Sequence, residues 1–476
     1  MKGIKRVHFI AVCGTGMGSL AGLMKSRGLH VTGSDLNIYP PMSIALADWN
    51  IPVSHGFKPE NVATDPPPDI VVIGNAVRPD NPEAQAAKNR NLPIYSFSDA
   101  LYEFAMRDKR RIVVSGTHGK TTTTSMLGTI LRDVGLEPSV LLGGISNNLG
   151  SSFVEGKGDY FIVEGDEYDT AFFDKTPKFL HYHPSFLILT TVEFDHADIY
   201  FDLDDVMDSF RRLVAAMPSD GFIVSANYLP NVAAVVKDAP CKVIPYSVGS
   251  TRSSGYLATG IVEEKFGTRF ELLHDGKFIS DFFLPTFGRY NVANATAALA
   301  VSLELGVSNH AASTALGSYC GVKRRQEVFG EVSGVTLIDD FAHHPTAVRE
   351  TLEALSSRFQ GRRIVAVFEP RSNTSRRSVF QKAYGESFDS AGRVVVSEVD
   401  QGPIYSATGR VDEFFSSTEL ACCLRERGLD AVALDGVESI VDEVARLSQV
   451  GDVIVTLSNG SFGNIREKLL NRLRKS

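Results

Sequence analysis

Cysteine is scarce in this sequence, and long apolar runs are absent. The chain of 476 residues has five cysteines, an odd number, and no two of them form a Cys-x-x-Cys pair. This pattern argues against a disulfide framework and favours a reduced, cytoplasmic setting. No apolar stretch approaches the ~18 residues of a membrane span. The short run 7–13 passes straight into a glycine-rich turn, so we predict a first strand there and not a signal peptide.

Basic blocks, repeats and low-complexity linkers are also missing. The net charge is −8, and nucleic-acid phosphates would demand clustered Lys and Arg, so we expect no nucleic-acid partner. With 43% hydrophobic and 22% charged residues, the composition is ordinary for a globular protein and excludes a disordered or fibrous class. A chain of 476 residues exceeds a single core, and we expect three domains.

The strongest motif predicts a phosphate-binding loop. An apolar strand leads into a turn with Gly116 and Gly119, and a helix with an apolar face follows. Such a turn brings backbone N–H groups to an anion, Lys120 adds positive charge, and Thr121 offers a hydroxyl to Mg²⁺. The full phosphate-loop pattern needs a glycine where this chain has Val114. The spacing therefore predicts nucleotide phosphate without identifying one family.

The N-terminal segment predicts a nucleotide-binding βαβ unit. A strand, the turn Gly14-Thr-Gly-Met-Gly18, a helix and a second strand ending at Asp35 follow one another. Ser19 occupies the third glycine position, so the match to a dinucleotide fingerprint is imperfect. The turn suits NAD, and it suits equally the diphosphate of a UDP-sugar whose hydroxyls Ser34 and Asp35 would reach.

Polar side chains follow several further predicted strands, where doubly wound sheets bind ligands. Gly74-Asn75, after one strand, indicates either a ligand contact or a simple turn. Glu164 and His196 follow two other strands, and few fixed ligands at such strand ends are what a Mg·ATP site needs. We predict both as Mg²⁺ ligands, although Asp195 suits Mg²⁺ better by residue type and His196 also fits an indirect role.

Further candidates have both a ligand-binding and a purely structural interpretation. Asn291 and Asn294 share one face at the start of an alanine-rich helix, where they fit nucleotide contact or helix capping. The cluster 339–344 has metal-ligand character, but a helix predicted directly after it would use the same residues as a cap. The basic run 323–325 fits a solvated face or the neutralisation of phosphate.

The order of motifs along the whole chain resembles that of the Mur ligases, ATP-dependent enzymes that join amino acids or peptides to UDP-N-acetylmuramic acid. The segments that carry the resemblance are Gly116-Thr-His-Gly-Lys-Thr-Thr, Glu164-Gly-Asp-Glu-Tyr-Asp, Glu193-Phe-Asp-His-Ala-Asp, Gly288-x-x-Asn291-x-x-Asn294 and Asp339-Asp-Phe-Ala-His-His-Pro345. The implied fold is α/β with three domains. The first domain, residues 1–108, would be Rossmann-like and bind the UDP-sugar. The second, residues 109–321, would be a P-loop ATPase-like parallel sheet and bind ATP. The third, residues 322–476, would be a second Rossmann-like domain and bind the incoming peptide. Strand-and-turn units that alternate with helical patterns in the last third fit that second doubly wound sheet.

The resemblance also implies roles for the matching residues. The implied catalytic residues are Lys120 and His196, with His343 or His344 as the base. The implied Mg²⁺ ligands are Thr121, Glu164 and His196. The implied ATP contacts are Gly116, Thr117, His118, Gly119, Lys120, Thr121, Thr122, Asn291, Asn294, Arg324, Arg325 and Asp339. The implied UDP-sugar contacts are Gly14, Thr15, Gly16, Met17, Gly18, Ser34, Asp35, Asn75 and Ala76, and the implied peptide contacts are Arg371, Ser372 and Asn373.

Within the family, the segment 369–374 resembles the branch that adds the tripeptide L-alanyl-γ-D-glutamyl-meso-diaminopimelate in cell-wall recycling. Members that add L-alanine typically carry a His-Arg-Tyr-Thr-Arg type segment where this chain has Arg371-Ser-Asn-Thr. We therefore expect UDP-N-acetylmuramate, ATP and the tripeptide as substrates and Mg²⁺ as the cofactor. An L-alanine ligase and, from a different class, an NAD-dependent dehydrogenase are the alternatives, and the oligomeric state stays open.

Overall fold

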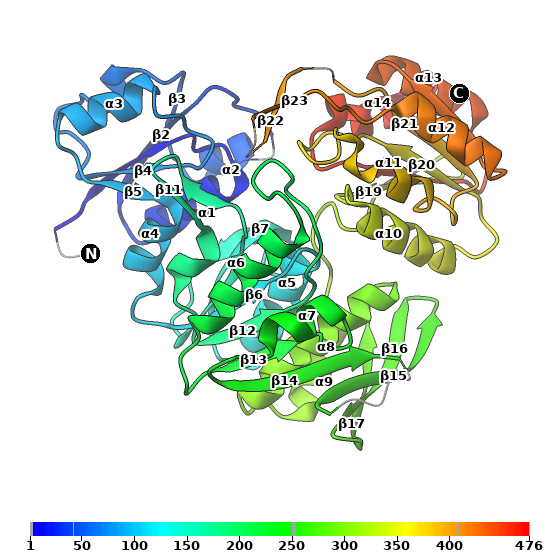
Figure 1. Ribbon diagram of the computed structural model, residues 1–476, viewed down its shortest axis with the longest axis horizontal. Coiled ribbons are helices and arrows are strands. Elements are labelled where there is room, and N and C mark those ends of the chain that lie inside the picture. Colours follow the sequence, from blue (N-terminus) through cyan, green and yellow to red (C-terminus); the bar gives the residue numbers. More distant parts are fainter. Residues whose placement is uncertain (1–2, 41, 250–253, 401, 407–408, 476) are drawn as a thin grey trace.

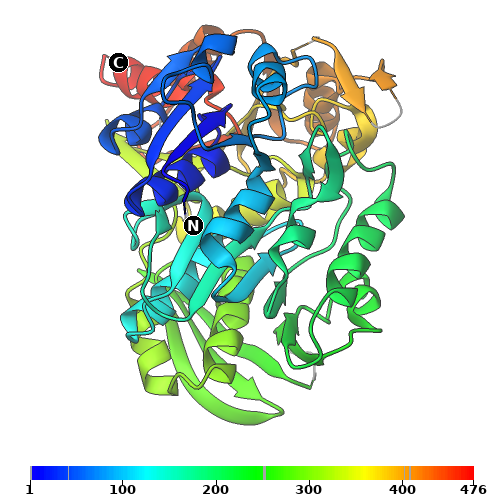
Figure 2. The same cartoon turned by 90° about the vertical axis from the view of Figure 1, so that its left-hand side faces the viewer.

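A computed structural model describes residues 3–40, 42–249, 254–400, 402–406 and 409–475. Figure 1 shows three sheet-and-helix units that follow one another along the chain, an N-terminal unit in blue, a central unit in cyan to green and a C-terminal unit in yellow to red. Turned by 90° in Figure 2, the N-terminal sheet lies above the central one. The predicted α/β class with three units is confirmed. The domain boundaries after residues 108 and 321 stay predictions.

The N-terminal unit contains a five-stranded parallel sheet in the order β3-β2-β1-β4-β5. Its strand β4 is buried along its whole length, as expected where both faces of a parallel sheet are covered. The first strand is shorter than predicted, because Ala11 turns the chain with a φ of 66° and donates its N–H to the Ser34 carbonyl. The elements are β1 (Arg6–Ile10), α1 (Thr15–Ser26), β2 (His30–Asp35), α2 (Met42–Asp48), β3 (Val53–His55), η1 (Pro59–Asn61), β4 (Ile70–Ile73), α3 (Pro82–Asn89), β5 (Ile94–Ser96), α4 (Phe97–Leu101) and η2 (Tyr102–Met106).

The central unit is built on a ten-stranded sheet in the order β17-β16-β15-β14-β13-β12-β6-β9-β7-β8. The strands around β6 are parallel, as predicted, whereas β15, β16 and β17 form an antiparallel extension that the sequence analysis did not anticipate. Helices α5 and α8 pack against each other. The elements are β6 (Arg110–Ser115), α5 (Lys120–Asp133), β7 (Ser139–Ser146), β8 (Ser151–Val154), β9 (Tyr160–Gly165), β10 (Asp169–Ala171), β11 (Asp174–Pro177), η3 (Lys178–Tyr182), β12 (Phe186–Leu189), α6 (Leu203–Ala215), β13 (Phe222–Ser225), α7 (Pro230–Val236), β14 (Lys242–Val248), β15 (Tyr256–Glu264), β16 (Gly267–His274), β17 (Lys277–Leu284), α8 (Arg289–Glu304) and α9 (Asn309–Gly317).

The C-terminal unit has a six-stranded sheet in the order β18-β19-β25-β20-β21-β24. Its strands are parallel except for β18, which pairs with β19 in the antiparallel sense at one edge. The predicted doubly wound sheet is thus present. The elements are β18 (Glu327–Val332), β19 (Val335–Asp340), α10 (Pro345–Arg358), β20 (Ile364–Phe368), η4 (Ser378–Phe380), α11 (Gln381–Gly385), β21 (Arg393–Ser397), β22 (Ile404–Ser406), β23 (Gly409–Val411), α12 (Ser417–Glu426), β24 (Asp430–Leu434), α13 (Val437–Leu447), β25 (Val453–Leu457), η5 (Phe462–Asn464) and α14 (Ile465–Leu473).

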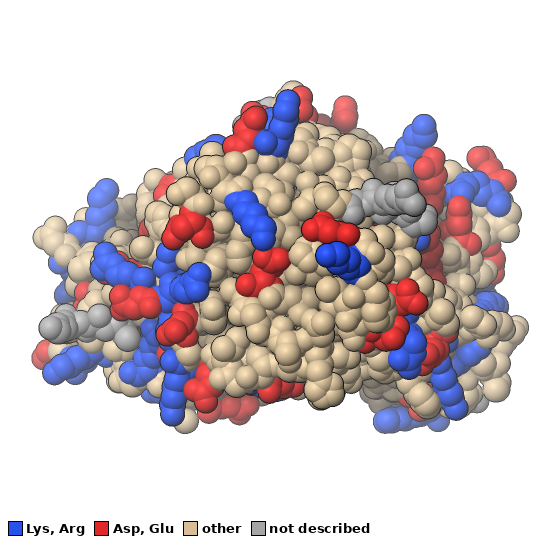
Figure 3. Space-filling model, turned by 90° about the horizontal axis from the view of Figure 1, so that it is seen from below, with Lys and Arg blue, Asp and Glu red and all other residues tan. Residues whose placement is uncertain are grey.

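The surface and the helices show the character that the composition suggests. On the face drawn in Figure 3, basic and acidic side chains are interspersed and leave broad uncharged areas between them. Within the described ranges, no helix combines the length and the apolar character needed to cross a bilayer.

Candidate functional site

The predicted phosphate loop connects β6 to α5 and requires glycine at two positions. Gly116 has a φ of 131°, and a Cβ there would lie 2.2 Å from the Thr190 hydroxyl. Gly119 has a φ of 83°, and a Cβ there would lie 2.3 Å from the side-chain oxygen of Asn294. The loop backbone is held by the chain after β12, since the N–H of Thr117 donates to the Thr191 carbonyl at 2.9 Å. The loop is therefore preformed, with its conformation set by local glycines and by a neighbouring strand end.

Lys120 folds back over this loop and meets a carboxylate. Its Nζ donates to the Gly116 carbonyl at 2.7 Å and to the two carboxylate oxygens of Glu167 at 2.8 and 3.0 Å. Burial acts to lower the pKa of Lys120, but the charges of Glu167 and Asp166 outweigh it and raise the pKa, so the ammonium stays charged. Sequence reasoning assigned no role to Glu167, although it lies inside the acidic segment that follows β9.

The predicted Mg²⁺ ligands gather beside the loop. The Thr121 hydroxyl donates to Glu164 at 3.1 Å, and the other carboxylate oxygen of Glu164 accepts from the Gly143 N–H at 2.6 Å. The Nε2 of His196 lies 3.0 Å from Glu167, and His196 has a strained φ of 54°. The Thr121 hydroxyl at the start of α5 and the Glu164 carboxylate near the end of β9 fit a hard divalent cation.

The two asparagines of α8 are engaged inside the protein. Asn291 donates its side-chain N–H to the Phe287 carbonyl at 2.8 Å, and Asn294 donates to the side-chain oxygen of Asn291 at 3.4 Å. The Thr123 hydroxyl of α5 donates to Asn294 at 3.2 Å. These amides therefore hold α8 against α5 next to the loop, and their predicted contact with ATP stays a prediction.

Arg324, Arg325 and Asp339 lie where the central and C-terminal units join. The Nε of Arg324 donates to Asp339 at 3.1 Å, and Arg466 donates to the same carboxylate oxygen at 3.1 Å. The guanidinium of Arg325 stacks over the Phe341 ring, 4.8 Å from its centroid. Asp339 is thus charge-compensated at the end of β19, and Arg325 is preorganised by an aromatic face.

The two adjacent histidines before α10 have different surroundings. His344 caps the helix, because its Nδ1 accepts from the Thr346 N–H at 3.2 Å, and its Nε2 donates to the Phe194 carbonyl of the central unit at 3.1 Å. Burial and nearby His118 lower the pKa of His344 to about 4. His343 bonds through Nδ1 to the Phe341 carbonyl at 2.9 Å, and burial lowers its pKa as well. With both nitrogens engaged, His344 has no free acceptor for a proton in this conformation.

The predicted UDP-sugar residues lie at one edge of the N-terminal sheet, because β1 pairs with both β2 and β4. The turn 14–18 opens α1, and Asn75 and Ala76 follow β4. The Asp35 carboxylate accepts from the N–H groups of Cys13 at 2.8 Å and Asn37 at 3.0 Å. These two hydrogen bonds hold the Asp35 carboxylate against the backbone that leads into the turn.

The side chain of Ser34 is also held by a hydrogen bond inside the N-terminal unit. Its hydroxyl donates at 2.8 Å to Glu83, a fully buried residue that the sequence analysis did not single out. Glu83 also accepts from Asn61 at 2.9 Å. No local sequence signal distinguishes Glu83, because its partners come from distant segments.

The segment that follows β20, in which the peptide contacts are predicted, lies against two loops. Arg371 lies 3.4 Å from the Ser461 hydroxyl, and Asn373 donates to Asp198 at 3.1 Å. Thr374, which the sequence analysis left without a role, accepts from the Ala197 N–H at 3.0 Å. The peptide segment thus contacts the loop that carries His196.

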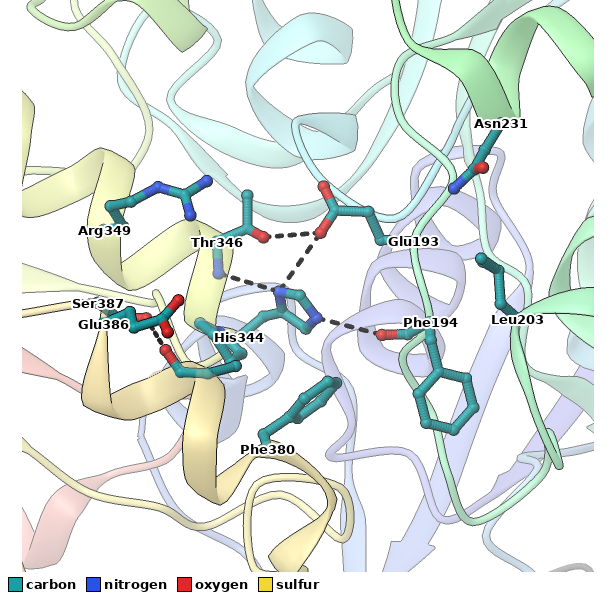
Figure 4. Close-up of a pocket in the computed structure, with 12 residues that line it drawn as sticks. Glu193, Phe194, Leu203, Asn231, His344, Thr346, Arg349, Phe380, Glu386 and Ser387 are labelled. Carbon is teal, nitrogen blue, oxygen red and sulfur yellow. Dashed lines mark hydrogen bonds and ion pairs between the residues drawn. The ribbon is translucent and has the colours of Figure 1, made fainter. Parts of the chain in front are cut away.

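A cavity of about 310 Å³ lies between the central and C-terminal units (Figure 4). Glu193 and Asn231 line it from one side, and His344, Arg349 and Phe380 line it from the other. Figure 4 shows Glu193, Thr346 and His344 pointing toward one another across the boundary.

Three family models match successive parts of the chain. They are described as Mur ligase family, catalytic domain (residues 6–109), Mur ligase middle domain (114–302) and Mur ligase, glutamate ligase domain (324–460).

Individual relatives match over the full length. The chain is 37% identical over 472 residues, 99% of this chain and 98% of the other, to the UDP-N-acetylmuramate–L-alanyl-gamma-D-glutamyl-meso-2,6-diaminoheptandioate ligase of Escherichia coli. It is 34% identical over 475 residues, 99% and 98% of the two chains, to the UDP-N-acetylmuramate–L-alanine ligase of Caldanaerobacter subterraneus. The crystal structure of a murein peptide ligase from Psychrobacter arcticus is similar with a TM-score of 0.74 and 31% identity, covering 100% of this chain and 99% of that one.

Proposed function

The chain belongs to the Mur ligase family, and we propose that it is the ATP-dependent ligase that joins L-alanyl-γ-D-glutamyl-meso-diaminopimelate to UDP-N-acetylmuramate in cell-wall recycling. The observation that carries this proposal is the full-length match, at 37% identity, to a relative named for that reaction. The preformed loop with Lys120 beside an acidic metal site supports the use of ATP and Mg²⁺.

The reaction needs activation because a carboxylate has no good leaving group. An oxygen of the lactyl carboxylate of UDP-N-acetylmuramate attacks the γ-phosphorus of ATP, and the bond to ADP breaks, which leaves an acyl phosphate. The α-amine of the tripeptide then attacks the acyl carbon, loses a proton, and inorganic phosphate departs as the amide forms. Transfer of this kind depends on positioning and on stabilisation of the developing charge.

Lys120 and its neighbours are suited to that charge stabilisation. In the proposed site, Lys120 exchanges part of its contact with Glu167 for phosphate oxygens, and its ammonium is already fixed at the loop. Thr121, Glu164 and His196 would hold Mg²⁺, which supplies further positive charge to the phosphates.

A base must accept the proton of the amine, and His343 suits this better than His344. If Nδ1–H of His343 donates to the Phe341 carbonyl, the lone pair of Nε2 remains available. The lowered pKa of His343 keeps the ring neutral, as a base requires. His344 instead acts as a cap and as a contact between units.

A product assay tests the proposed function directly. We expect ADP release that requires UDP-N-acetylmuramate together with an amine, and a strong preference for the tripeptide over L-alanine. The 34% identity to an alanine ligase makes that activity the second candidate, and a preference for free alanine would establish it instead.

The dehydrogenase alternative has little support in the fold. It leaves the Lys120 loop without a role. A change in nicotinamide absorbance with any small substrate would support the dehydrogenase alternative.

A further inference from the structure

Three side chains with metal-ligand chemistry converge outside the predicted Mg²⁺ site. The Nε2 of His118 lies 3.6 Å from a carboxylate oxygen of Glu193, and the Nδ1 of His344 lies 3.9 Å from the same oxygen. One ligand atom from each residue lies within 4.8 Å of the others. Bonds from Zn²⁺ to nitrogen and oxygen are about 2.0–2.2 Å, so ligand atoms around one ion are ~3.3 Å apart. Small side-chain movements would therefore suffice to enclose an ion.

The ring of His344 is oriented as a metal ligand would be. Its Nε2–H donates to the Phe194 carbonyl at 3.1 Å, which fixes the tautomer and leaves Nδ1 as the acceptor, 3.9 Å from the Glu193 oxygen. The Thr346 hydroxyl donates at 2.7 Å to the Glu193 oxygen that faces both histidines, which holds the carboxylate in place (Figure 4). The N–H of Thr346, 3.2 Å from Nδ1, is the contact that an ion would replace.

The imidazole of His118 is the second indication that these side chains could hold an ion. Its Nε2 is buried, and its contact with the Glu193 carboxylate, at 3.6 Å, is longer than a hydrogen bond. Its backbone is fixed, since the N–H donates to Thr191 at 2.8 Å and the carbonyl accepts from Thr190 at 2.6 Å. A buried polar atom whose contact is longer than a hydrogen bond costs free energy, and an ion bound between Nε2 and Glu193 would remove that cost.

We propose that His118, Glu193 and His344 form a second cation site, which binds a nitrogen-preferring divalent ion such as Zn²⁺ and links the phosphate loop to α10. Two imidazoles and one carboxylate suit Zn²⁺ and select against Mg²⁺, which prefers oxygen ligands. Three protein ligands leave a coordination position for water or a substrate atom. This site goes beyond the proposed ligase function and does not depend on it.

The test is metal binding by the nucleotide-free protein. We expect one high-affinity Zn²⁺ per chain by calorimetry, and a Co²⁺ spectrum with the intense visible bands of low coordination number. His118→Ala should reduce the affinity at least about tenfold. This variant removes the 3.6 Å contact with Glu193 and the ring packed on His344, so circular dichroism must show that it keeps the parent fold. Glu193→Gln should give the same loss.

The matched control is His196→Ala, which removes the imidazole of the predicted Mg²⁺ site and should leave Zn²⁺ binding intact. Loss of binding in His196→Ala with retention in His118→Ala would assign the ion to the other site and overturn the proposal. Equal affinity in the parent protein and His118→Ala, or no binding at all, would overturn it too.

Discussion

The central unit meets its two neighbours through surfaces in different proportions of apolar and polar contact. Toward the N-terminal unit, a single apolar cluster runs from one sheet to the other. Helix α1 approaches so closely that a Cβ on Gly22 would lie 2.5 Å from Phe153 and 2.7 Å from Trp49. These two rings pack edge to face, with centroids 5.0 Å apart.

Toward the C-terminal unit, the contacts are largely polar. The C-terminal apolar clusters are separate from the central one. Hydrogen bonds join the units, for example from the Thr346 hydroxyl to Glu193 at 2.7 Å and from the Ala197 N–H to the Thr374 hydroxyl at 3.0 Å. The ring centroids of Phe194 and Phe380 are 6.2 Å apart, farther than those of Trp49 and Phe153.

The difference indicates which unit moves. Separating an apolar surface exposes it to water, whereas hydrogen bonds between units can be exchanged for hydrogen bonds to water at small net cost. We therefore expect the N-terminal and central units to move as one body. The C-terminal unit, which carries the peptide segment, is expected to close over the phosphate loop during catalysis.

The largest expected effect separates nucleotide chemistry from sugar binding. Lys120→Ala should lower ADP release by about 10³-fold or more, because the charge at the loop is lost. Calorimetry should find the affinity for UDP-N-acetylmuramate unchanged, since that ligand is expected on the rigid N-terminal side. Lys242→Ala, which removes an exposed lysine paired with Glu304, is the control. Turnover retained in Lys120→Ala would contradict the role of this lysine.

Breaking the apolar surface should cost stability. Phe153→Ala removes a ring packed on Gly22 and Trp49, and we expect a loss of about 2–3 kcal/mol in the free energy of unfolding, since Phe153 is only partly buried. Trp49 is the only tryptophan, so its fluorescence in urea reports on this surface. Phe266→Ala, at a side chain that is 72% exposed, should change little. An unfolding curve for Phe153→Ala like that of Phe266→Ala would refute the apolar interface.

Weakening the polar surface should instead affect catalysis. The guanidinium of Arg377 donates to the Ala197 carbonyl, next to His196. Arg377→Ala should reduce kcat/KM for the tripeptide about tenfold and raise the Mg²⁺ concentration needed for half activity, with a stability change of about 1–2 kcal/mol. Arg410→Ala, at an exposed arginine near Asp412, serves as the control. An unchanged Mg²⁺ requirement would exclude positioning through the loop.

The smallest effect concerns a charged contact at the N-terminal side. His181 lies 2.9 Å from Asp99, and this hydrogen bond raises the pKa of His181. The stability that this contact contributes is fully present below the pKa of His181 in the unfolded chain, about 6.5. It is lost as pH rises through the higher pKa that His181 has in the folded protein. His181→Gln should thus lower the free energy of unfolding near pH 6, by less than about 1 kcal/mol because Asp99 is 41% exposed. Near pH 9 the decrease should be smaller still. Urea midpoints at both pH values measure this difference, with His310→Gln, at an exposed histidine, as the control. A loss of stability that grows with pH would be inconsistent with the contact.

Local pattern was sufficient for the elements nearest the chemistry. The strand, glycine turn and helix around Lys120 were predictable because all their parts are contiguous, and α10 begins where the cap interpretation of 339–344 places it. The antiparallel extension β15–β17 was not predicted, since pairing of strands is decided by distant partners.

The partners of the predicted residues also escaped prediction. Glu167 meets Lys120 across 47 positions of sequence, and Thr374 meets Ala197 across 177. Neither pair leaves a local spacing that could reveal it. Glu83 is a further example, because its partners Ser34 and Asn61 come from other elements.

The sequence by itself determined the order of three α/β units and the residue types at each strand end, because apolar periodicity and glycine turns act over a few residues. Only the tertiary structure decided which side chains share a charge, that His344 joins two units, and that one face of the central unit is largely apolar and the other largely polar. These properties depend on burial and on distances between remote segments, which come into being only when the chain has folded.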